Sequence, residues 1–331
     1  MMDRNKSTQS ATKRTNLMFS LIAKCKAFVK WYIPSGIIKK HRERIRAKRL
    51  EDLYNQFPKA KEASDYFLSL DRNKQSIEIV EIIDYIKKHG ISVFPYEIPN
   101  IKYRNIEIYF ERDIKMCFIL HEGKKMYFPE GWDTQRVLSY YKSLCIEQDA
   151  ASPHRYETAE YTVQPGDVIA DIGAAEGIWA LAYADVASKI YLFECENDWI
   201  KALSKTFEPW KDKIEIVNKY ISDRDGEKEI CLDTFFKNKK INFIKADVEG
   251  AEVKLLKGGQ SVLLKTYNLS LLLCVYHKQN DAEVINSILT GNGFRTEYSS
   301  RYMLFFFDDD IREPYVRRGL IRAKNKFSNR K

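Results

Sequence analysis

The stretch INFIKADVEGAEVKLLKGG, residues 241–259, decides the fold of this chain. Its apolar opening, Ile241 to Ile244, is typical of a strand buried in a parallel sheet. Three carboxylates follow the strand: Asp247, Glu249 and Glu252. The segment then takes on helical spacing and stops at Gly258-Gly259. Because the ends of such strands face the ligand crevice of an open α/β sheet, we expect these acids to handle a ligand.

Strand and helix alternate throughout the C-terminal half of the chain. Strands are predicted at 167–172, 189–195, 213–218, 241–246 and 269–276. Helices are predicted at 177–187, 198–207, 250–264 and 281–290. Residues 294–308 are predicted to add two strands joined at Ser299-Ser300. The short links indicate a parallel sheet, so we predict an α/β fold with a Rossmann-like sheet.

Four regions are expected along the chain. Residues 151–310 form the main domain, and residues 50–150 form a small α+β region. The latter is predicted to hold helices near 50–90 and 132–150, with a hairpin around Glu122-Gly123. Residues 1–49 are expected to be a basic amphipathic or disordered arm, and residues 311–331 a basic C-terminal tail.

Positive charge is concentrated at the two ends of the chain. The formal net charge is +9, yet residues 1–50 hold 14 Lys and Arg against 2 Asp and Glu, and residues 311–331 hold 8 against 1. Residues 51–310 are therefore acidic overall. Since the cations lie in the ends rather than on the folded body, we expect no nucleic-acid partner.

The N-terminal arm has the pattern of a membrane-surface helix. Residues 17–33 place their apolar side chains on one helical face, flanked by lysines. A break at Pro34-Ser35-Gly36 and a basic run at 39–49 follow. Residues 17–49 are thus a candidate for contact with an anionic membrane surface. The alternative is a helix docked on this protein's own domain or on a protein partner.

Cysteine usage predicts a cytoplasmic protein. The six cysteines form no Cys-x-x-Cys motif and no Cys/His cluster with zinc spacing. We expect no secretory signal, and no transmembrane helix because lysines interrupt the single candidate stretch. The expected location is the cytoplasm, with peripheral contact at the inner membrane face through the arm.

A glycine turn follows the first predicted strand. In PGDVIADIGAAEG, residues 165–177, Gly173 and Gly177 bracket the turn into a helix, which lets the backbone approach a ligand closely. The spacing is not the G-x-G-x-x-G of dinucleotide binders. Asp171, just before the turn, is placed to meet a cationic amino-acid group, and Glu194, at the end of the second strand, to hold ribose hydroxyls. The alternative for either acid is a helix cap or surface group.

Taken together, GDVIADIGAAEG, FIKADVEGAEVKLLKGG and LLLCVYHK resemble the FkbM-type family of S-adenosylmethionine-dependent methyltransferases, over roughly residues 161–308. The family turn is close to G-A-N-x-G, whereas Ala175 and Glu176 occupy its middle here. The resemblance implies a seven-stranded sheet with the last strand antiparallel, S-adenosylmethionine as cofactor, and methyl transfer to oxygen, often of a sugar. It implies that Glu194 holds the ribose and that Asp247 lies beside the methionine moiety or the acceptor. The residues implied to line the cofactor are Asp171, Gly173, Ala174 and Gly177.

A hydroxyl acceptor also needs a base to remove its proton. His277 follows the predicted strand at 269–276 and is favoured by position, and His154, just before the main domain, is the second histidine; either is alternatively structural. Asp247 is the third candidate. Arg155 and Tyr156 are predicted to contact a polar acceptor, or else to anchor the connector. A divalent metal such as Mg²⁺, held by Asp247 and Glu249 with another acid, is less favoured than a metal-free site.

The favoured function is O-methyl transfer to a sugar hydroxyl of a glycan, polysaccharide or glycosylated metabolite. The enzymatic alternative is a nicotinamide-dependent Rossmann oxidoreductase, which the missing third glycine counts against. The non-enzymatic alternative is a protein that binds nucleic acid or a membrane surface through its basic ends.

Overall fold

The structure, a computed structural model, describes residues 35–97 and 106–325 and divides into two units, 1–58 and 59–331. The first unit contains helix α2 (Ser35–Gln56). Charged residues occupy every side of this helix between Glu43 and Asp52, so that stretch has no apolar face of its own. The amphipathic helix predicted at 17–33 lies outside the described residues. In the described ranges, no helix has both the length and the apolar character needed to cross a bilayer.

The N-terminal part of the second unit consists of helices and a small sheet. Its helices are α3 (Pro58–Ser69), η1 (Arg72–Lys74), α4 (Ile77–His89) and α5 (Thr134–Glu147). Its antiparallel strands are β1 (Tyr109–Glu111), β2 (Met116–His121) and β3 (Lys124–Tyr127), so the predicted hairpin at Glu122-Gly123 is confirmed. The small sheet and α5 share one hydrophobic core with the large sheet. The helices and the small antiparallel sheet of residues 59–150 thus pack in one core with the main domain.

The large sheet has seven strands in the order β11–β12–β10–β9–β4–β5–β6. These are β4 (Val168–Ile172), β5 (Lys189–Phe193), β6 (Ile214–Val217), β9 (Phe243–Ala246), β10 (Ser270–Cys274), β11 (Phe294–Tyr298) and β12 (Leu320–Asn325). A separate parallel pair is formed by β7 (Tyr220–Ile221) and β8 (Glu229–Ile230). In the large sheet only β12 runs antiparallel to its neighbours. The predicted seven-stranded sheet with an antiparallel last strand is confirmed.

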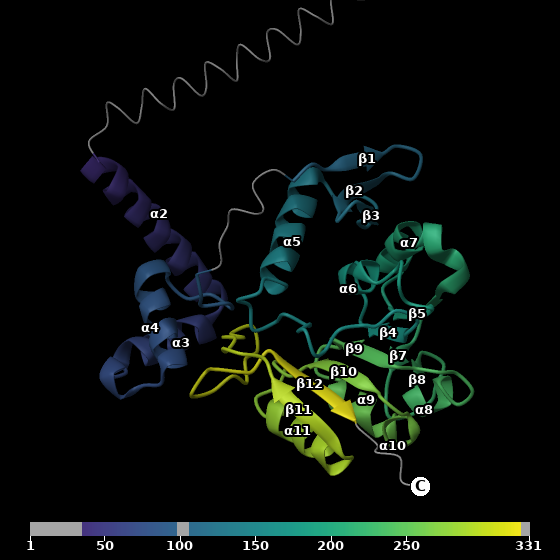
Figure 1. The fold of residues 1–331 in the computed structure, drawn as a ribbon. Coiled ribbons are helices and arrows are strands. Elements are labelled where there is room, and N and C mark those ends of the chain that lie inside the picture. The colour runs from purple at the N-terminus through teal and green to yellow at the C-terminus, as the bar shows by residue number, and fades with distance from the viewer. Residues whose placement is uncertain (1–34, 98–105, 326–331) are drawn as a thin grey trace, which may run out of the picture. The chain divides into compact units, whose positions relative to one another are not determined.

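Helices cover both faces of the large sheet (Figure 1). They are α6 (Ile178–Ala182), α7 (Asn197–Thr206), η3 (Glu208–Lys213), α8 (Leu232–Phe235), α9 (Glu252–Lys257), α10 (Gln260–Lys265) and α11 (Asp281–Gly291). Alternate residues of each strand serve opposite cores. In β5, Ile190 and Leu192 pack with α6 and α7, whereas Tyr191 and Phe193 pack with α8 to α11. Both faces are thus buried, as the apolar runs predict.

The C-terminal end of the sheet differs from the prediction. Residues 301–308, expected as a strand, contribute only an isolated bridge between Met303 and Arg317. The seventh strand is β12, which lies between β10 and β11, so residues 311–325 are not part of a tail and the main domain does not end at 310. The sequence prediction missed β12 because its charged residues, Arg322 and Lys324, suggested an exposed tail. Arg322 is 4% exposed because its guanidinium donates to the carbonyl oxygens of Arg155 and Tyr156.

Candidate active site

The glycine turn follows β4. It lies on the side of the sheet where the parallel strands β5, β9 and β10 also end. Gly173 has φ +72°, and a Cβ there would lie 2.0 Å from the carbonyl oxygen of Asp247. Glycine is therefore required, because the turn presses against the segment that follows β9. Gly177, at φ +74°, precedes α6. The turn predicted from the sequence is therefore present.

Glu194 lies beside this turn at the end of β5. Its Oε2 accepts a hydrogen bond from the Ala175 amide at 2.8 Å, and its Oε1 accepts from the amides of Cys195 and Glu196. Ala175 has φ +45°, a conformation more costly for alanine than for the asparagine of the family turn. The backbone contacts orient the carboxylate at the crevice, and its contact with a ribose stays a prediction.

Asp171 is paired with a lysine that the sequence did not single out. Asp171 and Lys245 are register partners on β4 and β9, and Lys245 Nζ lies 2.9 Å from Asp171 Oδ1. Both side chains are buried. Burial by itself lowers the pKa of Lys245, but the carboxylates of Asp171 and Asp247 outweigh it and raise that pKa. Lys245 also donates to the Gly173 carbonyl at 2.9 Å, so Asp171 supports the turn through Lys245 rather than facing the crevice freely.

The three predicted catalytic residues come together at the ends of β9 and β10. His154 Nε2 lies 3.5 Å from Asp247 Oδ2, and His277 Nε2 lies 3.3 Å from Asp247 Oδ1. The hydroxyls of Tyr156 and Tyr276 each donate to Asp247 at 3.2 Å. Burial by itself raises the pKa of Asp247, but the contacts with His154, together with Lys245 and His277, hold that pKa well below its ordinary value. Asp247 is thus a carboxylate throughout the neutral range.

Glu252 completes this cluster from the start of α9. It is fully buried, its Oε1 accepts from the Val248 amide at 3.1 Å, and the same oxygen lies 3.1 Å from His277 Nδ1. Burial by itself lowers the pKa of His277, but Glu252, Asp247 and Glu249 outweigh it and raise that pKa. The two carboxylates that flank the ring of His277 therefore favour its protonated form.

The cluster around Asp247 also contains atoms that metal ions bind. Two groups of possible ligands are close enough for an ion, His154 with Asp247 and Cys274, and Asp247 with Glu252 and His277. In the second group the carboxylates approach opposite ring nitrogens of His277, and one ion bonds only one of them. In the first group, the thiol of Cys274 is buried, which raises its pKa, and its Sγ already lies 3.6 Å from His154 Nε2. The donor sets favour a hydrogen-bonded cluster over a metal centre.

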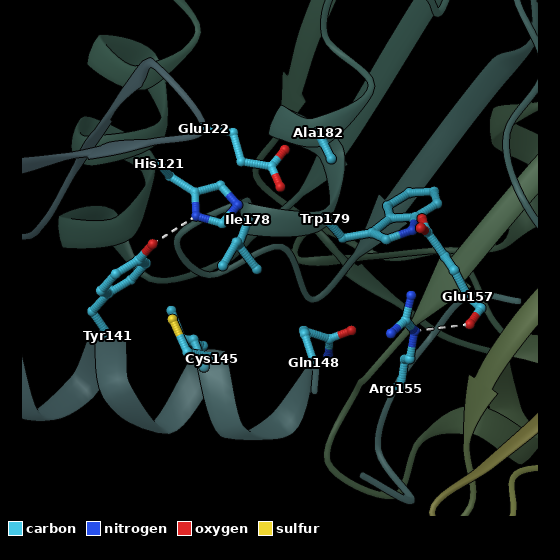
Figure 2. Close-up of a pocket in the computed structure, with 11 residues that line it drawn as sticks. His121, Glu122, Tyr141, Cys145, Gln148, Arg155, Glu157, Ile178, Trp179 and Ala182 are labelled. Carbon is cyan, nitrogen blue, oxygen red and sulfur yellow. Dashed lines mark hydrogen bonds between the residues drawn. The ribbon is translucent and has the colours of Figure 1, made fainter. Parts of the chain in front are cut away.

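Arg155 and Tyr156, the predicted acceptor contacts, diverge. Tyr156 reaches Asp247, whereas Arg155 lines a separate pocket of about 350 Å³ between α5, α6 and the end of β2. Figure 2 shows its guanidinium between Gln148 and Glu157, with Nε donating to the Glu157 carbonyl at 3.2 Å. The structure does not bring Arg155 to the cluster around Asp247, and a role for either residue in acceptor binding stays a prediction.

Two acids that the sequence did not assign to the site lie next to the turn. Glu176 and Glu147 line a cavity of about 20 Å³, room for roughly one water, together with Asp171, Ala174 and Lys245. Burial raises the pKa of Glu176 to about 7, against the opposing hydrogen bond that the Tyr140 hydroxyl donates at 2.9 Å. Glu176 stood in the quoted turn, but nothing in its spacing announced that it would be buried.

A larger cavity of about 470 Å³ opens on the other side of the cluster, where His154 and Tyr276 form part of its wall. Nε2 of His154 is turned toward Asp247. Among the described residues, Nδ1 of His154 has no hydrogen-bond partner. His154 is thus oriented by a carboxylate on one side and has a free nitrogen on the other, which is the arrangement of a general base.

Comparison with known proteins agrees with this geometry. The model of the methyltransferase FkbM domain matches residues 218–296. These residues are therefore similar to the methyltransferase FkbM domain. The strand order and the antiparallel β12 are those that we expected for a Rossmann-like methyltransferase sheet. No curated protein sequence matches the chain.

Several solved structures are similar to this chain at low identity. One is a methyltransferase FkbM from Methylobacillus flagellatus, with 15% identity, a TM-score of 0.39, and 58% of this chain and 55% of that chain covered. The match spans about half the length of that protein. Another is an rRNA methylase from Streptococcus thermophilus, with 12% identity, a TM-score of 0.36, and 50% and 90% covered. A third is TYW2 from M. jannaschii in complex with AdoMet, with 11% identity, a TM-score of 0.36, and 66% and 92% covered.

Proposed function

We propose that this protein is an S-adenosylmethionine-dependent O-methyltransferase that acts on a sugar hydroxyl of a glycan or glycosylated metabolite. One observation carries the proposal: His154, oriented by Asp247, lies at the strand edge that also holds the glycine turn. The family match of residues 218–296 supports methyl transfer, and the histidine–carboxylate pair supports a hydroxyl as the acceptor.

The residues at the turn fit this cofactor. Gly173 lets the turn pack against the backbone of Asp247, and Glu194 is oriented beside the turn by three amides. When bound, S-adenosylmethionine supplies an activated methyl group, so the protein's task is to position and deprotonate the acceptor. In our proposal Glu194 holds the ribose, and the backbone of 173–177 lies along the methionine moiety.

With the cofactor bound, the proton of the acceptor hydroxyl would pass to Nδ1 of His154, the oxygen–methyl bond would replace the sulfur–methyl bond, and S-adenosylhomocysteine would leave. Asp247 remains ionised and balances the imidazolium that results, while Tyr156 and Tyr276 hold its carboxylate in place. His277 is less suited to be the base, since Glu252 and Asp247 face its two nitrogens and raise its pKa. We therefore place His154 ahead of His277, reversing the order that the sequence favoured.

Calorimetric titration of the purified protein tests the cofactor. We expect saturable binding of S-adenosylmethionine and S-adenosylhomocysteine and none of NADH. Saturable binding of NADH alone would instead support the oxidoreductase alternative. The acceptor class is tested by mass spectrometry of glycans from cells with and without the gene, where loss of a methylated sugar is expected. Retention of every methylated sugar would contradict a glycan acceptor.

The two histidines are distinguished by a pair of variants. His154→Gln is expected to lower turnover about 10²–10⁴-fold without weakening cofactor binding, as loss of a base does. His277→Gln is expected to weaken the fold as well, because it leaves buried Glu252 without its cationic neighbour. Equal activity of His154→Gln and the wild type would remove His154 from the mechanism.

We also propose that residues 17–49 bring the protein to an anionic membrane surface in the cytoplasm. The cations of residues 1–50 support this, whereas α2 between Glu43 and Asp52 offers charge without an apolar face. Apolar contact would therefore come from the segment 17–33.

A further inference from the structure

The cavity of about 470 Å³ is large enough to bind a small molecule, within the range of ~300–1,000 Å³ that such sites occupy. Its walls come from α4 and the segment after it, α5, the end of β10 and residues 303–307. His154 and Tyr276 at its inner end are 3% and 8% exposed. His89, Glu97 and Phe307 at the other end are exposed. The cavity thus leads from the surface to the side chains of His154 and Tyr276.

Aromatic rings follow one another along this cavity. The ring centroids of Phe307 and Phe305 lie 5.7 Å apart, those of Phe305 and Tyr276 lie 4.9 Å apart, and those of Tyr276 and His154 lie 5.3 Å apart. Phe94 then lies 6.4 Å from His154. The C–H face of a sugar ring packs on such surfaces while its hydroxyls remain free for hydrogen bonds. The wall is therefore suited to a ring that is apolar on one face and carries hydroxyls at its edge.

The charges around the cavity decide which acceptors fit. Among the described residues, no lysine or arginine lines it, whereas Glu97 and Glu147 do. The nearby cations already have partners. Lys88 Nζ lies 2.5 Å and His89 Nε2 2.7 Å from the carboxylate of Glu97, and Arg301 contacts Glu81 and stacks on the Tyr96 ring. A phosphate in the cavity would therefore find no lysine or arginine among the described lining residues, whereas phosphate sites use such cations.

Glu147 connects this cavity to the glycine turn. Its side chain lines both the aromatic cavity and the small cavity beside Ala174 and Glu176. Burial raises the pKa of Glu147, and a carboxyl in either protonation state is able to form a hydrogen bond with a hydroxyl. An acceptor held on the aromatic wall would therefore present its hydroxyl between Glu147 and His154, on the side of the cofactor turn.

We infer that this aromatic cavity is the acceptor site and that it takes an uncharged, hydroxyl-bearing sugar ring rather than a sugar phosphate or a nucleotide-activated sugar. The inference rests on the proposed function for its reaction, but its binding claim is independent of methyl transfer. In this arrangement the sugar is methylated as a neutral glycoside, with its phosphate-bearing part, where the acceptor has one, outside the cavity.

Direct binding tests the inference with three sets of probes. These are neutral 4-nitrophenyl hexosides, the corresponding hexoside 6-phosphates, and UDP-hexoses, each titrated calorimetrically into the full chain in the presence of S-adenosylhomocysteine. We expect saturable binding of at least one neutral hexoside and weaker binding of its 6-phosphate. Phe305→Ala should weaken the neutral probe about tenfold, the scale of one lost aromatic contact. Phe307→Ala, at the exposed end, provides a second variant in case Phe305→Ala perturbs the fold.

Phe110→Ala is the matched control, since Phe110 is an exposed aromatic on β1 that does not line the cavity. It should bind the neutral probe like the wild type. Three results would overturn the inference. The phosphate-bearing probes bind more tightly than the neutral ones, no neutral probe binds saturably, or Phe305→Ala and Phe307→Ala both bind the neutral probe as tightly as the wild type does. Failure of S-adenosylhomocysteine to bind would count against the proposed function, and neutral-probe binding measured without it would still decide the cavity.

Discussion

Glu176 offers a prediction whose size follows from the structure. Its side chain is 5% exposed, and burial raises its pKa to about 7 from the ordinary value of 4.5. The folded protein therefore binds more protons than the unfolded chain between these two pH values. Stability that is present below about pH 4.5 is lost as the pH rises through about 7. At about 1.36 kcal/mol for each pKa unit, about 2.5 kcal/mol of this loss falls between pH 5 and pH 8.

Glu176→Gln isolates this term, because glutamine keeps an oxygen for the Tyr140 hydroxyl and does not ionise. Relative to the wild type, its free energy of unfolding should rise by about 2.5 kcal/mol between pH 5 and pH 8. Urea unfolding followed by tryptophan fluorescence at both pH values measures the difference. Glu227→Gln, in the exposed loop between β7 and β8, controls for loss of a negative charge. A difference that does not change with pH, or that changes with the opposite sign, refutes the reasoning.

Three further predictions concern the turn, the carboxylate and the arm. Asp247→Asn should lower methyl transfer by on the order of 10²–10⁴-fold, with a native circular dichroism spectrum, because the imidazolium of His154 loses its counter-charge; full turnover would remove Asp247 from the mechanism. Gly173→Ala should destabilise the protein more than Gly123→Ala in urea unfolding. Both glycines have positive φ, at a cost of ~1–2 kcal/mol for alanine, but only the Cβ at 173 collides with backbone; equal losses would contradict this. Deletion of residues 1–49 should abolish co-sedimentation with anionic vesicles, and unchanged binding would exclude the arm as the contact.

The strands predicted at 167–172, 189–195, 241–246 and 269–276 formed as β4, β5, β9 and β10. These strands are buried on both faces, so most of their positions are apolar and the pattern was visible locally, whereas the charged residues Asp171 in β4 and Lys245 in β9 pair with each other. β12 carries Arg322 and Lys324 and was taken for a tail. Its buried arginine is satisfied by carbonyl oxygens 166 and 167 residues away in the chain, which no local pattern reveals.

The apolar run at 301–308 misled in the opposite direction. Its aromatic residues suit a strand, yet Phe305 and Phe307 line the large cavity while Met303 and Leu304 are buried. Hydrophobicity alone does not distinguish a strand from an irregular segment that lines a cavity. The composition was therefore informative about burial but not about the backbone conformation.

The sequence by itself determined the fold class, the glycine turn and the acids that follow β5 and β9, because each depends on spacing within one strand, turn and helix. Only the tertiary structure decided what those acids contact. Strand register paired Asp171 with Lys245, and the path of the connector brought His154 and Tyr156 to Asp247 while it turned Arg155 into another pocket. Tyr156 and Asp247, 91 residues apart in the chain, meet through strand register and packing. Their burial and their contacts then shift their pKa values. No short stretch of sequence encodes either the contact or the pKa shifts.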